Sequence, residues 1–248
     1  MVTYPVEAFV SRDYLETEAQ LLWPRVWQMA DRVEVVPNVG DFFTYNVCRD
    51  SIIVIRVKEG SDPGAIKAFH NVCAHRGRQL IDTPPGVHSV TGNRRNFLCG
   101  FHGWSYDLDG LNTFILDPQD WQKAGPGLDA NCTSLTSVRV ETWGGWIFIN
   151  MDPEAEPLLP FLGEVPRILD PFAFDQMRYK WRNWVIFDCN WKTGLEAFME
   201  PYHVTGTHSQ LLEYGEYYAY SKAFGLHGVS GFDQRDQTLR DIGGSTST

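Results

Sequence analysis

Two short stretches of the sequence each carry one cysteine and one histidine. The first contains Cys73 and His75, and the second contains Cys99 and His102, with 23 residues between His75 and Cys99. Thiolate sulfur and imidazole nitrogen are side-chain ligands that zinc and iron bind readily in proteins. Strand-forming residues flank both stretches, so both pairs are expected in turns between strands. The sequence therefore predicts a metal centre built from two turns that fold together.

The division of sulfur and nitrogen ligands between the two turns favours one kind of centre. In a Rieske [2Fe-2S] cluster two thiolates hold one iron and two imidazoles hold the other, so each turn would give one ligand to each iron. The imidazoles raise the reduction potential to roughly −150 to +300 mV, above that of an all-cysteine cluster. A structural zinc site is one alternative, although its usual layout pairs Cys with Cys and His with His. Four unrelated core or surface residues are the other alternative.

A second group of candidate ligands lies toward the C-terminal end of the chain. On a helix, Glu196, Glu200 and His203 would fall within about 60° of one another, because each residue turns the helix by about 100°. His208 would lie about 140° from His203. Both histidines can therefore reach one metal only if the helix bulges or ends, and Gly206 offers a place for that. Two imidazoles and a carboxylate are typical ligands of non-heme iron oxygenases; the alternative is a solvated helix face.

Short β-forming runs surround the cysteine–histidine pairs and predict an antiparallel sheet, within an α+β protein. Strands are expected at 33–36, 42–47, 52–57, 66–72 and 141–151, with the glycines at 144–145 as a bulge. Helical spacing predicts two short helices over 11–27, with Ser11 as a cap and Pro24 as a break. The C-terminal part is expected to open with a strand at 179–188 and a helix at 190–204.

Five prolines between positions 152 and 171 indicate a linker between two different domains. The predicted organisation is an N-terminal helical segment at 1–36, a β domain at 37–152, the linker at 153–171 and a second domain at 172–248.

The composition excludes several classes of partner. Lys and Arg total 21 against 31 Asp and Glu, and the resulting net charge of −10 argues against nucleic acid or an anionic membrane surface. No apolar run is long enough for a membrane helix and the N-terminus lacks a signal-peptide pattern, so a cytoplasmic protein is expected. The five cysteines do not predict disulfides, and Cys48, Cys132 and Cys189 are expected to be buried.

With these motifs in place, the chain resembles the large (alpha) subunit of Rieske non-heme iron oxygenases of the ring-hydroxylating type. The motifs that carry the resemblance are LWPRVW at 22–27, NVGD at 38–41, FHNVC at 69–73, HGWSY at 102–106 and the His203 region. The resemblance implies an antiparallel β Rieske domain followed by an incomplete helix-grip catalytic domain of antiparallel sheet and helices. The gap between the two ligand pairs is longer than the family commonly shows, so 84–96 is expected to form an extra surface loop.

The resemblance also implies site residues and cofactors. Cys73, His75, Cys99 and His102 would bind the Rieske 2Fe-2S cluster, and His203 and His208 would bind a mononuclear non-heme Fe(II). Glu200 would be the catalytic carboxylate that links the two centres, between His102 of one subunit and His203 of its neighbour in a homotrimer. Many ring-dihydroxylating members carry aspartate at this position and some amine monooxygenases carry glutamate.

The implied function is the oxygenase component of a multicomponent Rieske system, a mono- or dioxygenase. Electrons from NAD(P)H would arrive through a ferredoxin or flavin reductase, and dioxygen would be used to hydroxylate or demethylate a small organic substrate, as in aromatic hydrocarbon catabolism. The family's third iron ligand, an aspartate, would lie beyond residue 248, with Asp233, Asp236 and Asp241 as available substitutes. The alternative function is a Rieske-type electron carrier with a catalytically inert C-terminal remnant.

Overall fold

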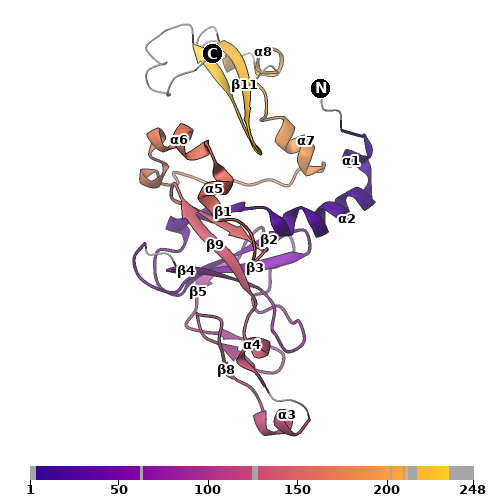
Figure 1. The fold of residues 1–248 in the computed structure, drawn as a ribbon, viewed down its shortest axis with the longest axis vertical. Coiled ribbons are helices and arrows are strands. Elements are labelled where there is room, and N and C mark those ends of the chain that lie inside the picture. The colour runs from indigo at the N-terminus through magenta and orange to yellow at the C-terminus, as the bar shows by residue number, and fades with distance from the viewer. Residues whose placement is uncertain are drawn as a thin grey trace. The chain divides into compact units, whose positions relative to one another are not determined.

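The computed structural model describes residues 4–61, 64–124, 128–201, 203–208, 210–211 and 217–234 (Figure 1). The chain divides into two compact units, Thr17–Leu158 and a second unit that combines Met1–Glu16 with Leu159–Thr248. No helix among the described residues is both long and apolar enough to cross a membrane.

Short helical segments α1 (Glu7–Val10), α2 (Arg12–Leu21) and a 3₁₀ turn (Trp23–Arg25) form the N-terminal part. The last two confirm the pair of short helices predicted over 11–27, whereas α1 lies before that range. The hydroxyl of Ser11 accepts a hydrogen bond from the N–H of Tyr14 at 3.3 Å, which caps the start of α2. Pro24 lies inside the 3₁₀ turn, where its missing N–H interrupts no helical hydrogen bond.

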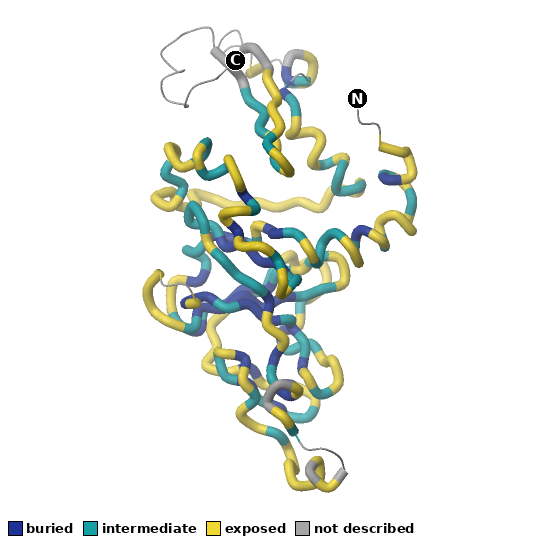
Figure 2. The backbone as a smooth tube through the Cα atoms, in the orientation of Figure 1, coloured by how far each residue is buried: buried dark blue, intermediate teal, exposed yellow. Residues whose placement is uncertain are grey.

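A seven-stranded antiparallel sheet forms the centre of the first unit (Figure 1). Its strands, in the order β1-β10-β9-β4-β3-β2-β5, are β1 (Gln28–Arg32), β10 (Trp146–Asn150), β9 (Ser137–Trp143), β4 (Ile66–His70), β3 (Asp50–Arg56), β2 (Asp41–Val47) and β5 (Thr91–Asn93). Strand β3 is buried on both faces: Ile53 and Ile55 pack into one apolar cluster, and Ile52 and Val54 into another. Figure 2 shows the buried backbone concentrated in this sheet. The predicted strands 42–47, 52–57 and 66–72 are confirmed within two residues.

A smaller three-stranded sheet carries the second ligand pair. Its strands are β6 (Phe97–Leu98), β7 (Ser105–Tyr106) and β8 (Asn112–Phe114), and the short helices α3 (Pro118–Ala124) and α4 (Ala130–Thr133) follow. The turn between β7 and β8 has Gly110 at φ +82°, where a Cβ would lie 2.5 Å from the Phe69 ring. Only glycine fits there, because both the backbone angle and the space exclude a side chain.

Two predictions for this unit are wrong. Residues Val33–Val35 form a 3₁₀ turn instead of a strand, and β1 precedes them. The predicted strand 141–151 is the hairpin β9–β10, because Gly144 and Gly145 adopt φ values of +59° and +76° and form its two-residue turn instead of a bulge. The expected surface loop 84–96 is exposed along most of its length, as predicted, and it includes the short strand β5, which pairs with β2.

The second unit contains short helices and one hairpin. Its elements are α5 (Leu158–Leu162), α6 (Val165–Leu169), 3₁₀ turns at Asp170–Phe172 and Phe174–Gln176, α7 (Trp191–Glu196), α8 (Val204–Thr207), β11 (Tyr217–Phe224) and β12 (His227–Gln234). The proline-rich segment is therefore partly helical, and Pro166 occupies the first turn of α6, where proline is tolerated.

Two further predictions for the second unit are wrong. Residues 179–188 are not a strand: no strand among the described residues pairs with them, and the side chains of Trp181 and Ile186 are 73% and 76% exposed. The helix predicted at 190–204 starts where expected, because the side chain of Asn190 caps it by accepting a hydrogen bond from Lys192 N–H at 3.0 Å. It ends at Glu196, however, well before residue 204. Pro201 disfavours helical angles at Glu200, the residue before it, so the helix could not have continued to 204.

Candidate metal centres

The two cysteines of the ligand pairs lie in turns with the same backbone hydrogen bonds. The carbonyl of Cys73 accepts from Gly77 N–H at 3.0 Å, and its N–H donates to the carbonyl five residues ahead at 2.8 Å. Cys99 repeats this pattern with Gly103 and the residue after it, also at 3.0 and 2.8 Å. Both glycines have positive φ, +73° and +72°, which glycine adopts without strain. A glycine four residues after each cysteine is therefore part of the site, and this spacing is visible in the sequence.

These two turns bring the four predicted cluster ligands together. Cys73 and Cys99 are buried, 2% and 3% exposed, and belong to the same cluster of buried residues. The ring centroids of His75 and His102 lie 4.6 Å apart. Each turn therefore supplies one sulfur and one imidazole to the same place, as the Rieske arrangement requires.

The chemistry of these side chains fits a cluster with two ligands for each iron. The Nδ1 atom of His102 is buried and finds no hydrogen-bond partner among the described residues, an arrangement that costs free energy unless something binds this nitrogen. Burial lowers the pKa of His75, with help from His102 and the charge of Arg76, so its imidazole is kept in the neutral form that binds metals. No three His, Cys, Asp or Glu side chains of the described residues form a single-ion site.

Tyr106 lies directly against the first sulfur. Its hydroxyl is 3.0 Å from the Sγ of Cys73 and accepts a hydrogen bond from Ala74 N–H at 3.2 Å. Because the backbone N–H already occupies the oxygen as acceptor, the phenolic hydrogen is available to donate to sulfur. Burial, and then the contact with Cys73, raises the pKa of Tyr106, so the phenol keeps this hydrogen.

Replacing Tyr106 with phenylalanine should lower the reduction potential of the cluster. The substitution removes a hydrogen bond to a ligand sulfur, and such bonds stabilise the more negative, reduced state. A redox titration followed by visible absorption would measure the change. Phenylalanine retains the ring that fills the core, so cluster content should stay the same. An unchanged or higher potential at full cluster content would show that the phenol does not donate to the sulfur.

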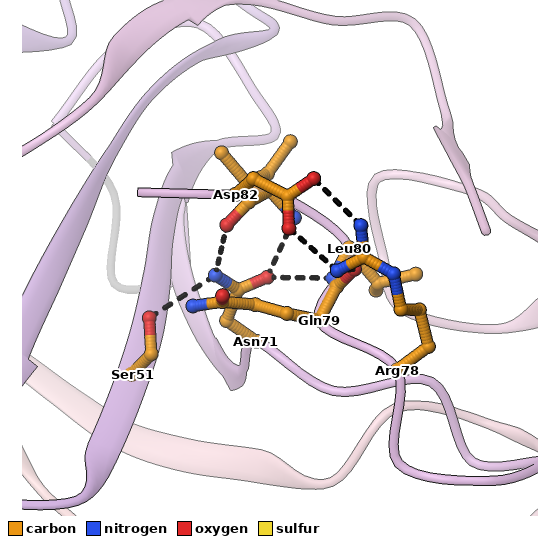
Figure 3. A network of polar contacts seen from close by, with 7 residues as sticks. Ser51, Asn71, Arg78, Gln79, Leu80 and Asp82 are labelled. Carbon is orange, nitrogen blue, oxygen red and sulfur yellow. Dashed lines mark hydrogen bonds and ion pairs between the residues drawn. The ribbon is translucent and has the colours of Figure 1, made fainter. Parts of the chain in front are cut away.

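Asn71 ties the segment after the first turn to the sheet (Figure 3). Its amide nitrogen donates to Ser51 Oγ at 3.1 Å and to the carbonyl of Ile81 at 2.7 Å. Its amide oxygen accepts from the N–H groups of Leu80 and Ile81 at 3.1 and 2.9 Å. All hydrogen-bonding groups of this buried amide therefore have partners. The bonds to Leu80 and Ile81 fix the path of the chain directly after the turn that holds Cys73 and His75.

A surface ion pair reinforces the same segment. The guanidinium of Arg78 donates to both carboxylate oxygens of Asp82, with one of the two distances at 2.7 Å (Figure 3). The pair is exposed, so its contribution to stability is small. Arg78 also belongs to the first ligand turn, because its carbonyl accepts a hydrogen bond from Cys73 N–H. The ion pair therefore holds a residue of that turn.

In the second unit one carboxylate and two histidines of the candidate site lie near one another, without forming a three-ligand site in the described part of the chain. Glu200 Oε1 lies 2.7 Å from Nδ1 of His203, and its other oxygen accepts the backbone N–H of His203 at 3.1 Å. The rings of His203 and His208 have centroids 5.4 Å apart. His203 and His208 flank α8, which is a single helical turn. The helix therefore ends before His208, which is one of the two conditions under which both histidines can reach one metal.

The expected helical face that includes Glu196 is wrong. Glu196 is the last residue of α7, and the chain is non-helical from there to α8, so the 100° spacing does not apply. Asp236 and Asp241 lie outside the described residues, as does the side chain of Asp233. The described cysteines are all free, as expected, but Cys48, Cys132 and Cys189 are exposed and not buried.

Two family models match the chain. Residues 26–119 match the Rieske [2Fe-2S] domain, and residues 172–241 match the ring hydroxylating alpha subunit (catalytic domain). These two domains use a Rieske [2Fe-2S] cluster and a mononuclear non-heme iron, so both predicted cofactors are confirmed at the level of the domains.

Curated relatives match most of this chain. The large oxygenase component of the 2,4-dinitrotoluene dioxygenase system of Burkholderia sp. (strain RASC) is 30% identical over 210 residues, which cover 83% of this chain and 44% of the relative. The glycine betaine monooxygenase oxygenase subunit of Pseudomonas aeruginosa (strain UCBPP-PA14) is 28% identical, with 84% and 45% covered. The chain thus spans less than half the length of these relatives.

Solved structures show the same fold. The quaternary ammonium Rieske monooxygenase CntA in complex with L-carnitine has a TM-score of 0.77 at 22% identity, covering 92% of this chain and 62% of that one. Naphthalene 1,2-dioxygenase with indole bound has a TM-score of 0.66 at 30% identity, covering 84% and 45%. The chain therefore carries one region that matches the Rieske [2Fe-2S] domain and one that matches the ring hydroxylating alpha subunit (catalytic domain), and most of its length is similar to large oxygenase components.

Proposed function

We propose that this chain acts in the oxygenase component of a multicomponent Rieske system. The observation that supports this most strongly is the convergence of Cys73, His75, Cys99 and His102 from two equivalent turns. In this proposal the two cysteines hold one iron and the two histidines the other. The cluster, when bound, supplies electrons one at a time, and the mononuclear iron supplies the activation of dioxygen.

The contact between Glu200 and His203 supports a role for both residues at the mononuclear iron. A carboxylate beside Nδ1 favours the tautomer that carries its hydrogen there, which leaves Nε2 free to bind a metal. His208 would be the second ligand. Glu200 would thus be a positioning residue for His203, and its link to His102 of a neighbouring subunit in a homotrimer belongs to the same proposal.

The proposed reaction is hydroxylation or demethylation of a small organic substrate, with electrons from a ferredoxin or flavin reductase. Relatives named for aromatic compounds and for quaternary amines both match the chain, and the glutamate at position 200 favours the amine class.

Metal analysis of the purified chain separates the proposed function from its alternatives. About three irons and two labile sulfides per chain would support an oxygenase. About two irons with the same sulfide would support an electron carrier instead, and zinc without sulfide would contradict both.

Replacing His203 and His208 together with alanine should remove about one iron per chain and leave labile sulfide unchanged, because the cluster ligands lie elsewhere in the sequence. His227→Ala is the matched control, since the His227 ring is held 2.7 Å from the carbonyl of Phe161 and has no role in the proposed site. Iron content that stays the same in the double variant would refute the two histidines as ligands.

A further inference from the structure

Two tryptophans enclose the imidazole of His75. The Trp104 ring stacks on it with centroids 4.9 Å apart and an interplanar angle of 9°. The Trp121 ring meets it edge-on at 5.1 Å and 84°, and the two indoles contact each other at 5.8 Å. The imidazole therefore contacts two apolar rings, one stacked on it and one nearly perpendicular to it.

The two tryptophans come from different parts of the fold. Trp104 is buried and directly follows the turn of Cys99, so its position is a consequence of the ligand turn itself. Trp121 lies on α3, outside both turns, and is 38% exposed. The other residues of α3 are mostly polar, so Trp121 is the large apolar side chain that attaches this helix to the site.

We propose that Trp121 is a positioning residue that shields His75 from water and thereby lowers the reduction potential of the cluster. This inference rests on the proposed function, in which His75 holds an iron. The oxidised centre has two ferric ions, two sulfides and two thiolates and is neutral overall, so one-electron reduction gives it a negative charge. Water stabilises that charge and an apolar ring does not, which makes reduction harder where Trp121 covers the imidazole.

The test compares Trp121→Ala, Trp121→Leu and Trp121→Phe with the wild-type chain in its cluster-bound form. The midpoint potential is measured by dithionite titration, and the access of water to His75 is measured by deuterium couplings in the pulsed EPR spectrum of the reduced cluster in D₂O. Trp121→Ala should raise the potential and strengthen the deuterium couplings. Trp121→Leu should change the potential and the couplings in the same direction as Trp121→Ala, but by a smaller amount. Trp121→Phe should keep both near their wild-type values.

Phe114→Ala is the matched control, because Phe114 is an exposed aromatic residue of strand β8 in the same small sheet. It should leave the potential and the couplings unchanged. A Trp121→Ala or Trp121→Leu variant with full cluster content and wild-type potential would overturn the shielding role alone. A wild-type chain without labile sulfide would instead overturn the proposed function on which this inference rests.

Discussion

Replacing Cys99 with alanine should abolish the visible absorption and the EPR signal of the reduced cluster while the Rieske unit remains folded. The thiol is buried beside Cys73, and no other cysteine belongs to the two ligand turns. The turn itself is held by backbone groups, the N–H of Gly103 and the carbonyl of Trp104, and alanine keeps both bonds. One iron would lose a thiolate ligand, whereas the free energy of unfolding would change little.

Absorption spectra, labile sulfide and far-UV circular dichroism of the Cys99→Ala variant would measure these effects together. Cys132→Ala is the matched control, because Cys132 is free and exposed, and it should keep the full cluster content. A variant at position 99 that retains sulfide and the visible spectrum would show that the ligand assignment is wrong.

Replacing Asn71 with alanine should destabilise the Rieske unit by about 3–5 kcal/mol. The substitution leaves the N–H groups of Leu80 and Ile81 and the carbonyl of Ile81 without the partner that they have in the folded chain. Each buried polar group without a partner costs about 1–3 kcal/mol. The segment behind the first ligand turn would also lose its anchor, so cluster content should fall.

Denaturant unfolding followed by tryptophan fluorescence would measure the change in the free energy of unfolding. Asn46→Ala is the matched control, since Asn46 is exposed and donates one hydrogen bond, to His88. Its effect should stay within about 0.5 kcal/mol. If the two substitutions cost the same, the buried amide of Asn71 does not support the site.

The strands that the sequence predicted well are those with the clearest apolar pattern. In β2, β3 and β4, β-branched and aromatic residues stand between turn-forming residues, and the structure has strands there. The sequence predicts one strand where the hairpin β9–β10 lies, because Gly144 and Gly145 fit either a bulge or a two-residue turn, and only the pairing of the two strands distinguishes these.

The convergence of the two cysteine–histidine pairs could be predicted from their spacing, and part of their surroundings from the motifs around them. Asn71 lies two residues before Cys73, and Tyr106 lies in the same motif as His102, so the sequence already places both near the pairs. Trp121 could not be predicted in this way, because it contacts His75 through the tertiary fold alone. At the second site the helical spacing predicts one face for Glu196, Glu200 and His203, yet Glu200 and His203 meet where the chain leaves the helix.

If the two turns bind a single [2Fe-2S] unit through two sulfurs and two imidazoles, both histidines must couple magnetically to the reduced cluster. Electron–nuclear double resonance on the reduced protein, labelled with ¹⁵N-histidine, measures these couplings. We expect two distinct histidine nitrogens coupled to one reduced cluster. A cluster without histidine couplings, or a metal centre that is not paramagnetic after reduction, would contradict it.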